Sequence, residues 1–116
     1  MFLQLNHQKL DVFIAAKSFT FECYKFTKML PSEEKFNMVQ QVRRASLSVY
    51  LNIAEGCSRK SVVERKRFYE IARGSVIEVD TAFDIAFSLG YTSKEKLADL
   101  GTLLVRSFQL ISKMIS

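Results

Sequence analysis

Apolar residues recur at alternating spacings of three and four through most of the chain, which is the period of one face of an α-helix. No stretch shows the strict alternation of a half-buried strand. The clearest run lies near the N-terminus and comprises Val12, Ala16, Phe19, Cys23, Phe26 and Leu30. The pattern therefore predicts amphipathic helices that bury one stripe against their neighbours.

Few residues in the chain break helices, and they divide it into four segments. Pro31 ends the first segment, Gly56–Ser61 ends the second and Gly90–Ser93 ends the third, while the fourth runs to the end of the chain. Gly56 and Gly90 stand where left-handed C-caps are expected. Short connections make neighbouring helices antiparallel, so we expect one all-α domain over residues 1–116, an up-down-up-down four-helix bundle.

Capping residues support helix starts directly after these breaks. A serine or threonine followed three residues later by glutamate predicts a capping box at Ser61–Glu64 and at Thr92–Glu95. Residues 31–34, Pro-Ser-Glu-Glu, predict a capping serine and two acids at the positive end of the second helix.

A second apolar stripe accompanies the first on three of the four segments. Its members are Phe36, Leu47, Tyr50, Leu51, Tyr69, Val76, Phe83, Phe87, Leu100, Leu103, Leu110 and Met114. One apolar face suffices for a helix in an isolated bundle, so two faces favour burial against another copy of the chain. The alternative is one wide core filled by bulky side chains.

Polar residues form a stripe of their own on the second segment, with spacings of 3, 4, 4 and 3. The stripe comprises Gln41, Arg44, Ser48, Asn52 and Glu55. Arg44 lies too far from Glu55 to pair with it, and Glu78 is a candidate partner for Arg44. We interpret the five residues with Glu78 as a structural polar seam, because no nucleophile or metal-ligand set accompanies them.

Basic residues concentrate around the break between the second and third segments. The net charge is +5, from 17 Lys and Arg against 12 Asp and Glu. Within fifteen positions lie Arg59, Lys60, Arg65, Lys66, Arg67 and Arg73, opposed by Glu64 and Glu70. Pairs of Glu70 with Lys66 and Arg73 would mute this cluster. We nevertheless take Arg59, Lys60, Arg65, Lys66 and Arg67 as candidates for phosphate contacts, with Arg43 and Arg73 as supplements, whereas a solvated helix start is the simpler alternative.

Other chemistry is sparse. The single histidine, His7, has no evident nucleophile partner, and glycine-rich phosphate loops and paired CxxC motifs are absent. We therefore expect no enzyme activity, no cofactor and no metal. Two cysteines do not make a disulfide framework, and no apolar run reaches membrane-spanning length, so we expect a cytoplasmic protein without a membrane partner.

The run from Gln41 to Gly56, QVRRASLSVYLNIAEG, resembles the signature of a bacterial family, the four-helix bundle proteins encoded in 23S rRNA intervening sequences. That signature is roughly Q-x-x-R-A-x-x-S-[IV]-x-x-N-I-A-E-G. Residues 72–78, ARGSVIE, resemble the family's A-x-G-S-x-x-E motif, and residues 30–34 and 89–91 also match. Tyr50 and Leu51 are bulkier than the residues usual at their positions.

The resemblance implies a four-helix bundle that assembles as a homo-oligomer, a pentamer in the family. The family is also related to the accessory variability determinant of diversity-generating retroelements, a basic pentamer that works with a reverse transcriptase. Our leading hypothesis is a non-enzymatic homo-oligomer that binds RNA or DNA through a repeated basic surface. The alternative is a protein-interaction scaffold, such as an accessory subunit of a retroelement reverse transcriptase.

Overall fold

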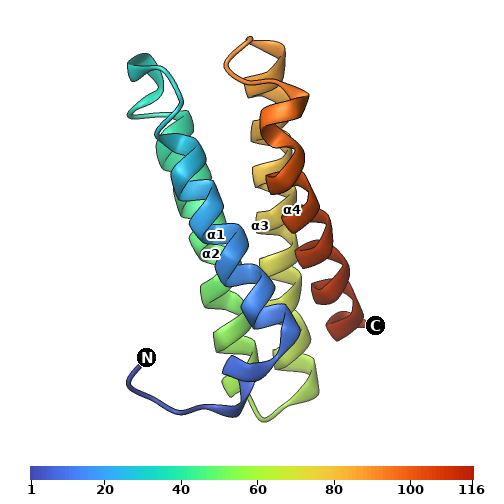
Figure 1. The fold of residues 1–116 in the computed structure, drawn as a ribbon. Helices are drawn as coiled ribbons and strands as arrows, with labels where there is room; N and C mark the ends of the chain where they lie inside the picture. Colours follow the sequence, from blue (N-terminus) through green and yellow to red (C-terminus); the bar gives the residue numbers. More distant parts are fainter.

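The computed structural model describes residues 1–116 and contains no strand. Four α-helices make up most of the chain, and a short 3-10 helix precedes each of the first two (Figure 1). The elements are η1 (Asn6–Lys9), α1 (Asp11–Thr27), η2 (Ser32–Glu34), α2 (Met38–Ser58), α3 (Val62–Ser88) and α4 (Lys94–Ile115). The four-helix all-α class predicted from the periodicity is confirmed. None of the helices combines the length and apolar character needed to cross a membrane.

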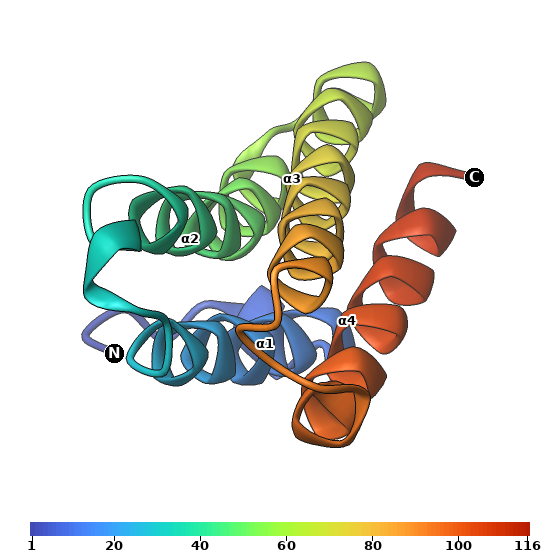
Figure 2. The same ribbon diagram turned by 90° about the horizontal axis from the view of Figure 1, so that it is seen from above.

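Neighbours in the chain are neighbours in space. The contacts that build the bundle join α1 to α2, α2 to α3, α3 to α4 and α4 back to α1. In Figure 1, α1 and α2 lie on one side of the bundle and α3 and α4 on the other, and Figure 2 shows the four helices around one interior. The connections between helices are short, so consecutive helices run antiparallel, as expected.

The predicted stripes form the core. All six apolar residues of the first run are at most 9% exposed, and Phe19 and Cys23 are fully buried. Across the interior, the rings of Phe26 on α1 and Phe83 on α3 meet edge to face with centroids 4.9 Å apart. The core thus ties together helices that are not neighbours in the chain.

The second apolar stripe divides between core and surface. Val76 and Phe83 are buried, so the wide-core alternative explains part of the stripe. Phe36 is 79% exposed and Leu51 is 53% exposed. These exposed members leave apolar surface that a single chain does not cover.

Two of the predicted helix ends are confirmed. The Ser61 side chain accepts a hydrogen bond from the Glu64 amide at 3.3 Å, which caps α3. Gly90 adopts a φ of 79°, in the left-handed region that favours glycine, just after α3.

Three details of the helix ends were predicted wrongly. Ser93, not Thr92, caps α4, because it is the Ser93 hydroxyl that accepts from the Lys96 amide, at 3.2 Å. Ser32 does not cap α2, because residues 32–34 form η2 and α2 begins only after Asn37. The Glu34 carboxylate nevertheless accepts from the Met38 amide at 3.3 Å, so the acid does serve this helix start.

Gly56 is the third correction: it lies inside α2 and has no positive φ. A Cβ built on Gly56 would lie 2.5 Å from Tyr69 Cε1, far inside van der Waals contact. Glycine is required here because α3 approaches α2 closely at the Tyr69 ring.

Candidate nucleic-acid interface

The basic residues predicted to contact phosphate gather at one end of the bundle, where α2 passes into α3. Arg59 and Lys60 lie in the connection, and Arg65 and Arg67 follow on the first turns of α3; all four side chains are exposed. Lys66 is half-buried. The structure therefore brings these five residues together, as a consequence of the tight turn between the two helices.

Local contacts hold two of the arginines. Arg59 pairs with Glu55 at 3.1 Å, and its guanidinium lies 4.9 Å from the centroid of the Phe68 ring. Arg65 Nε donates to the backbone carbonyl of Arg59 at 2.5 Å. These contacts orient the turn and leave donors of both guanidinium groups available to solvent.

The remaining cations have no ion-pair partner. Neither of the pairs expected for Glu70, with Lys66 or with Arg73, forms in the structure. Lys66 and Arg73 are seven residues apart and share one side of α3, whereas Arg67 points about 100° around the helix. The basic surface therefore wraps the N-terminal half of α3 and is not a single stripe.

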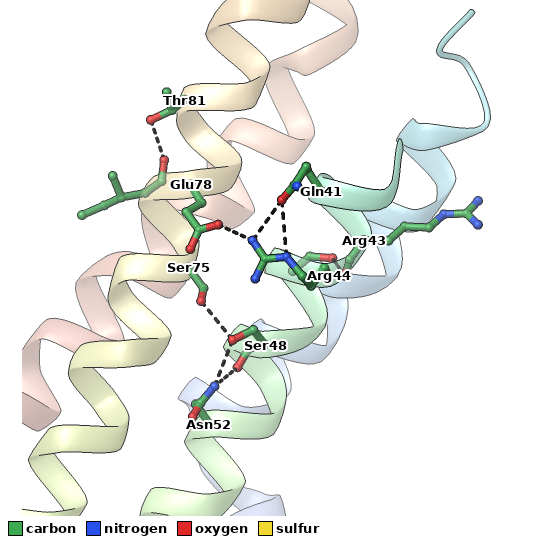
Figure 3. Close-up of polar contacts among 10 residues, drawn as sticks. Gln41, Arg43, Arg44, Ser48, Asn52, Ser75, Glu78 and Thr81 are labelled. Carbon is green, nitrogen blue, oxygen red and sulfur yellow. Dashed lines mark hydrogen bonds and ion pairs between the residues drawn. The ribbon is translucent and has the colours of Figure 1, made fainter. Parts of the chain in front are cut away.

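Arg43 does not belong to this surface. It precedes Arg59 by sixteen residues, about 24 Å along α2. Its Nε donates to Thr27 Oγ1 at 2.8 Å, and its guanidinium lies 5.2 Å from the Tyr24 ring centroid. In Figure 3 the Arg43 side chain points away from α3. Arg43 thus links α2 to α1, and its role as a supplementary phosphate contact stays a prediction.

The polar seam between α2 and α3 is present (Figure 3). Arg44 Nη2 lies 2.6 Å from Glu78 Oε2, the pairing suggested from the sequence, and Gln41 Oε1 accepts from the same nitrogen at 3.1 Å. Lower down, Ser75 donates to Ser48 at 3.0 Å. The seam thus links the two helices at two levels.

Asn52 and Glu55 complete the stripe without reaching α3. Asn52 Nδ2 donates to the Ser48 carbonyl at 2.8 Å and to the Ser48 hydroxyl at 2.9 Å. Glu55 pairs with Arg59 at the end of its own helix, not with a distant element. The Arg44 and Glu78 side chains are 58% and 52% exposed, so in the single chain the seam lies at the surface and contributes modest stability.

The structure does not assemble an enzyme-like cleft from the candidate residues. Glu55 and Glu78 are held in separate ion pairs, and Cys57 instead faces a small pocket that Tyr69 and His7 also line. Burial and a 3.5 Å contact with Cys57 raise the pKa of Tyr69 to about 12. No three His, Cys, Asp or Glu side chains are grouped so that they could hold a metal ion.

Sequence reasoning missed this pocket because its members are far apart in the chain. His7 lies in η1, and its ring packs edge-on against Phe13 with centroids 4.9 Å apart. A histidine six residues before a core phenylalanine is not a sequence pattern that predicts a pocket.

The fold and the basic turn define a class of basic four-helix bundles, and comparisons with known proteins agree. A model of the 23S rRNA-intervening sequence protein family matches residues 8–115, and the chain belongs to this family.

Among solved structures, the chain is similar to a protein of unknown function from the S23 ribosomal protein family of Bacteroides thetaiotaomicron VPI-5482. The two share 21% identity with a TM-score of 0.83, over 90% of this chain and 98% of the other. At this identity the likeness shows the fold. The comparison with curated proteins gave no match.

Proposed function

We propose that this protein is a non-enzymatic, homo-oligomeric scaffold that binds nucleic acid through the basic surface at the α2–α3 turn. One observation carries the proposal. Among the five cations gathered there and Arg73, which follows further along α3, only Arg59 is in an ion pair, which leaves five without a carboxylate partner. These five are Lys60, Arg65, Lys66, Arg67 and Arg73.

Phosphate is the ligand that suits this arrangement. Guanidinium groups bind phosphate oxygens through paired N–H donors, and lysines add mobile positive charge. The basic side chains point in different directions around α3. This arrangement suits the phosphate backbone of a nucleic acid that passes over the turn better than it suits a single small anion. Self-association would repeat the surface around the assembly and strengthen its field.

Self-association is supported by the apolar side chains that remain exposed, including Leu51 and Phe36. The family resemblance of the sequence implies five copies. We place the protein in the cytoplasm, where its two cysteines, both free in the structure, would remain thiols. A retroelement reverse transcriptase is the alternative partner, as the resemblance drawn from the sequence implies.

The test is a fluorescence-anisotropy titration of the purified protein against labelled structured RNA and duplex DNA. The test variant replaces Arg65, Lys66 and Arg67 by alanine. A charge-matched control replaces three lysines at the other end of the chain's fold, Lys28, Lys35 and Lys96. Both variants are compared with the wild type at equal salt, with mass and helicity checked in parallel.

We expect the test variant to lose at least tenfold in affinity while the control stays close to the wild type. Equal losses in both variants would mean that only net charge matters, and retained affinity in the test variant would refute the assignment. No binding at low salt would refute nucleic-acid binding and leave a protein partner as the alternative.

A further inference from the structure

A groove runs between α3 and α4, at the end of these helices that is remote from the basic surface. It encloses about 510 Å³, and its floor is apolar, formed by Phe83, Leu97 and Leu104. Two small residues of α4, Ala98 and Gly101, form part of its wall. Nothing lies within 4 Å of a Cβ built on Gly101, so the space above this glycine is open.

The rim of the groove is acidic on one side. Asp80 and Asp84 lie one turn apart on α3, both exposed, and neither has an ion-pair partner in the chain. Lys94 borders the groove at its end, where its ammonium group lies 5.8 Å from the Phe87 ring centroid. The groove therefore suits an apolar segment that carries positive charge toward α3.

The outer face of α1 has this character. Ile14, Lys17, Phe21 and Lys25 follow one another at spacings of 3, 4 and 4, so they form one stripe on the helix. Phe21 is 63% exposed and Ile14 is 55% exposed, although both are large and apolar. The Lys25 ammonium lies 5.3 Å from the Phe21 ring centroid and pairs with the Glu22 carboxylate at 3.3 Å, whereas Lys17 has no ion-pair partner, so Lys17 presents its charge beside the apolar surface.

These two surfaces cannot meet within one chain. Val12, Ala16 and Phe19 face the interior of the bundle, so the outer stripe of α1 faces away from the other helices. The complementary surface on α1 is thus available only to the groove of another molecule.

We propose that the outer face of α1 of one copy docks into the α3–α4 groove of the next copy, with Phe21 against the floor beside Gly101 and with Lys17 and Lys25 facing Asp80 and Asp84. This inference rests on the self-association in the proposed function and names the surfaces that carry it. The two surfaces are different patches of the same chain, so the contact is head to tail. Repetition closes a ring if the rotation between copies closes.

A head-to-tail contact can be tested with two variants, each of which disrupts one of the two contact surfaces. Phe21→Asp places a charge on the α1 face and leaves the groove intact. Gly101→Phe fills the groove and leaves α1 intact, and the open space at Gly101 lets the bundle accept the ring. Masses of the wild type, each variant and the equimolar mixture are measured by sedimentation velocity, and circular dichroism checks helicity.

We expect each variant alone to have the mass of one chain, 13.3 kDa, and the mixture to give about twice that mass. The mixture stops at a pair because the intact groove of the Phe21→Asp variant binds the intact α1 face of the Gly101→Phe variant. The two surfaces left exposed on the pair are both altered, so no third chain can add. Val63→Asp serves as the matched control, since Val63 is 79% exposed but lies on neither surface, and it should keep the wild-type mass.

Three outcomes would overturn the inference. If both variants keep the wild-type mass, copies associate elsewhere, and the proposed function stands without this interface. If the variants are folded monomers whose mixture also stays monomeric, the contact is not head to tail. If the wild type is itself a monomer, the proposed self-association fails together with its interface.

Discussion

The close approach of α2 and α3 at Gly56 yields a quantitative prediction about stability. Replacing Gly56 by alanine would place the new methyl carbon 2.5 Å from Tyr69 Cε1 and 2.9 Å from Cδ1. The backbone carbonyl oxygen of Arg65 would lie 3.2 Å from the same methyl carbon, so a shift of the ring alone would not relieve all of the crowding. Gly56→Ala should therefore destabilise the bundle, although alanine is the better helix former.

The magnitude follows from two opposing effects. Overpacking a well-filled site costs about 1–3 kcal/mol, and exchanging glycine for alanine inside a helix returns about 1 kcal/mol. The expected net loss is up to about 2 kcal/mol in the free energy of unfolding. Gly74→Ala is the matched control, because nothing lies within 4 Å of a Cβ built there. That variant should gain about 0.5–1 kcal/mol.

Urea unfolding followed by circular dichroism measures both changes at equal protein concentration. A double-mutant cycle with Tyr69→Ala isolates the clash with the ring, since most of the cost of Gly56→Ala should disappear once the ring is gone and only the 3.2 Å approach to the Arg65 carbonyl oxygen remains. A Gly56→Ala variant as stable as the Gly74→Ala variant would refute the reasoning, because it would show that the approach of the two helices is loose.

Three further predictions follow from buried and paired groups. Ser107 is fully buried and its hydroxyl has no hydrogen-bond partner, so Ser107→Ala should stabilise the protein by up to about 1 kcal/mol in urea unfolding; a loss would show a hidden partner. The exposed Arg44–Glu78 pair should show a coupling of at most about 1 kcal/mol in a double-mutant cycle, and a larger value would mean that assembly buries it. Burial raises the pKa of the Cys23 thiol from 9.0 to about 12. Between these pH values the folded state keeps a proton that the unfolded state loses, so the free energy of unfolding should fall as the pH rises from 9.0 to about 12. Cys23→Ala should flatten that pH dependence, whereas an unchanged slope in the variant would assign it to other groups.

The helices and their core stripes were predictable from the sequence because a helix that buries one face repeats its apolar residues every three to four positions. That spacing depends only on local helix geometry. Gly90 was predictable for the same reason, since a left-handed C-cap is a local feature. Gly56 was not, because its role depends on a tyrosine thirteen residues later that reaches it only across the α2–α3 packing. Single-chain periodicity cannot show which residues of two helices come into register.

The candidate site shows the same division. The concentration of cations near the turn was visible as a run in the sequence. The Arg44–Glu78 pair was predictable because Arg44 lies too far from Glu55 to pair with it and therefore needs a carboxylate on another helix. The direction of the Arg43 side chain could not be predicted, because its charge alone does not show which neighbouring helix it contacts. Its contacts with Thr27 and Tyr24 depend on how α1 packs against α2. The α3–α4 groove was missed because it results from small residues on α4, which give no apolar signal.

Phosphate binding at the α2–α3 turn should be visible in the salt dependence of the affinity for nucleic acid. The affinity of the wild type and of the Arg65, Lys66 and Arg67 triple-alanine variant is measured on duplex DNA across a series of salt concentrations. Each phosphate contact contributes about 0.9 to the slope of log affinity against log salt concentration. We predict a steep slope for the wild type and one shallower by up to about 2.7 for the variant. Equal slopes, or an affinity independent of salt, would contradict phosphate binding at this surface.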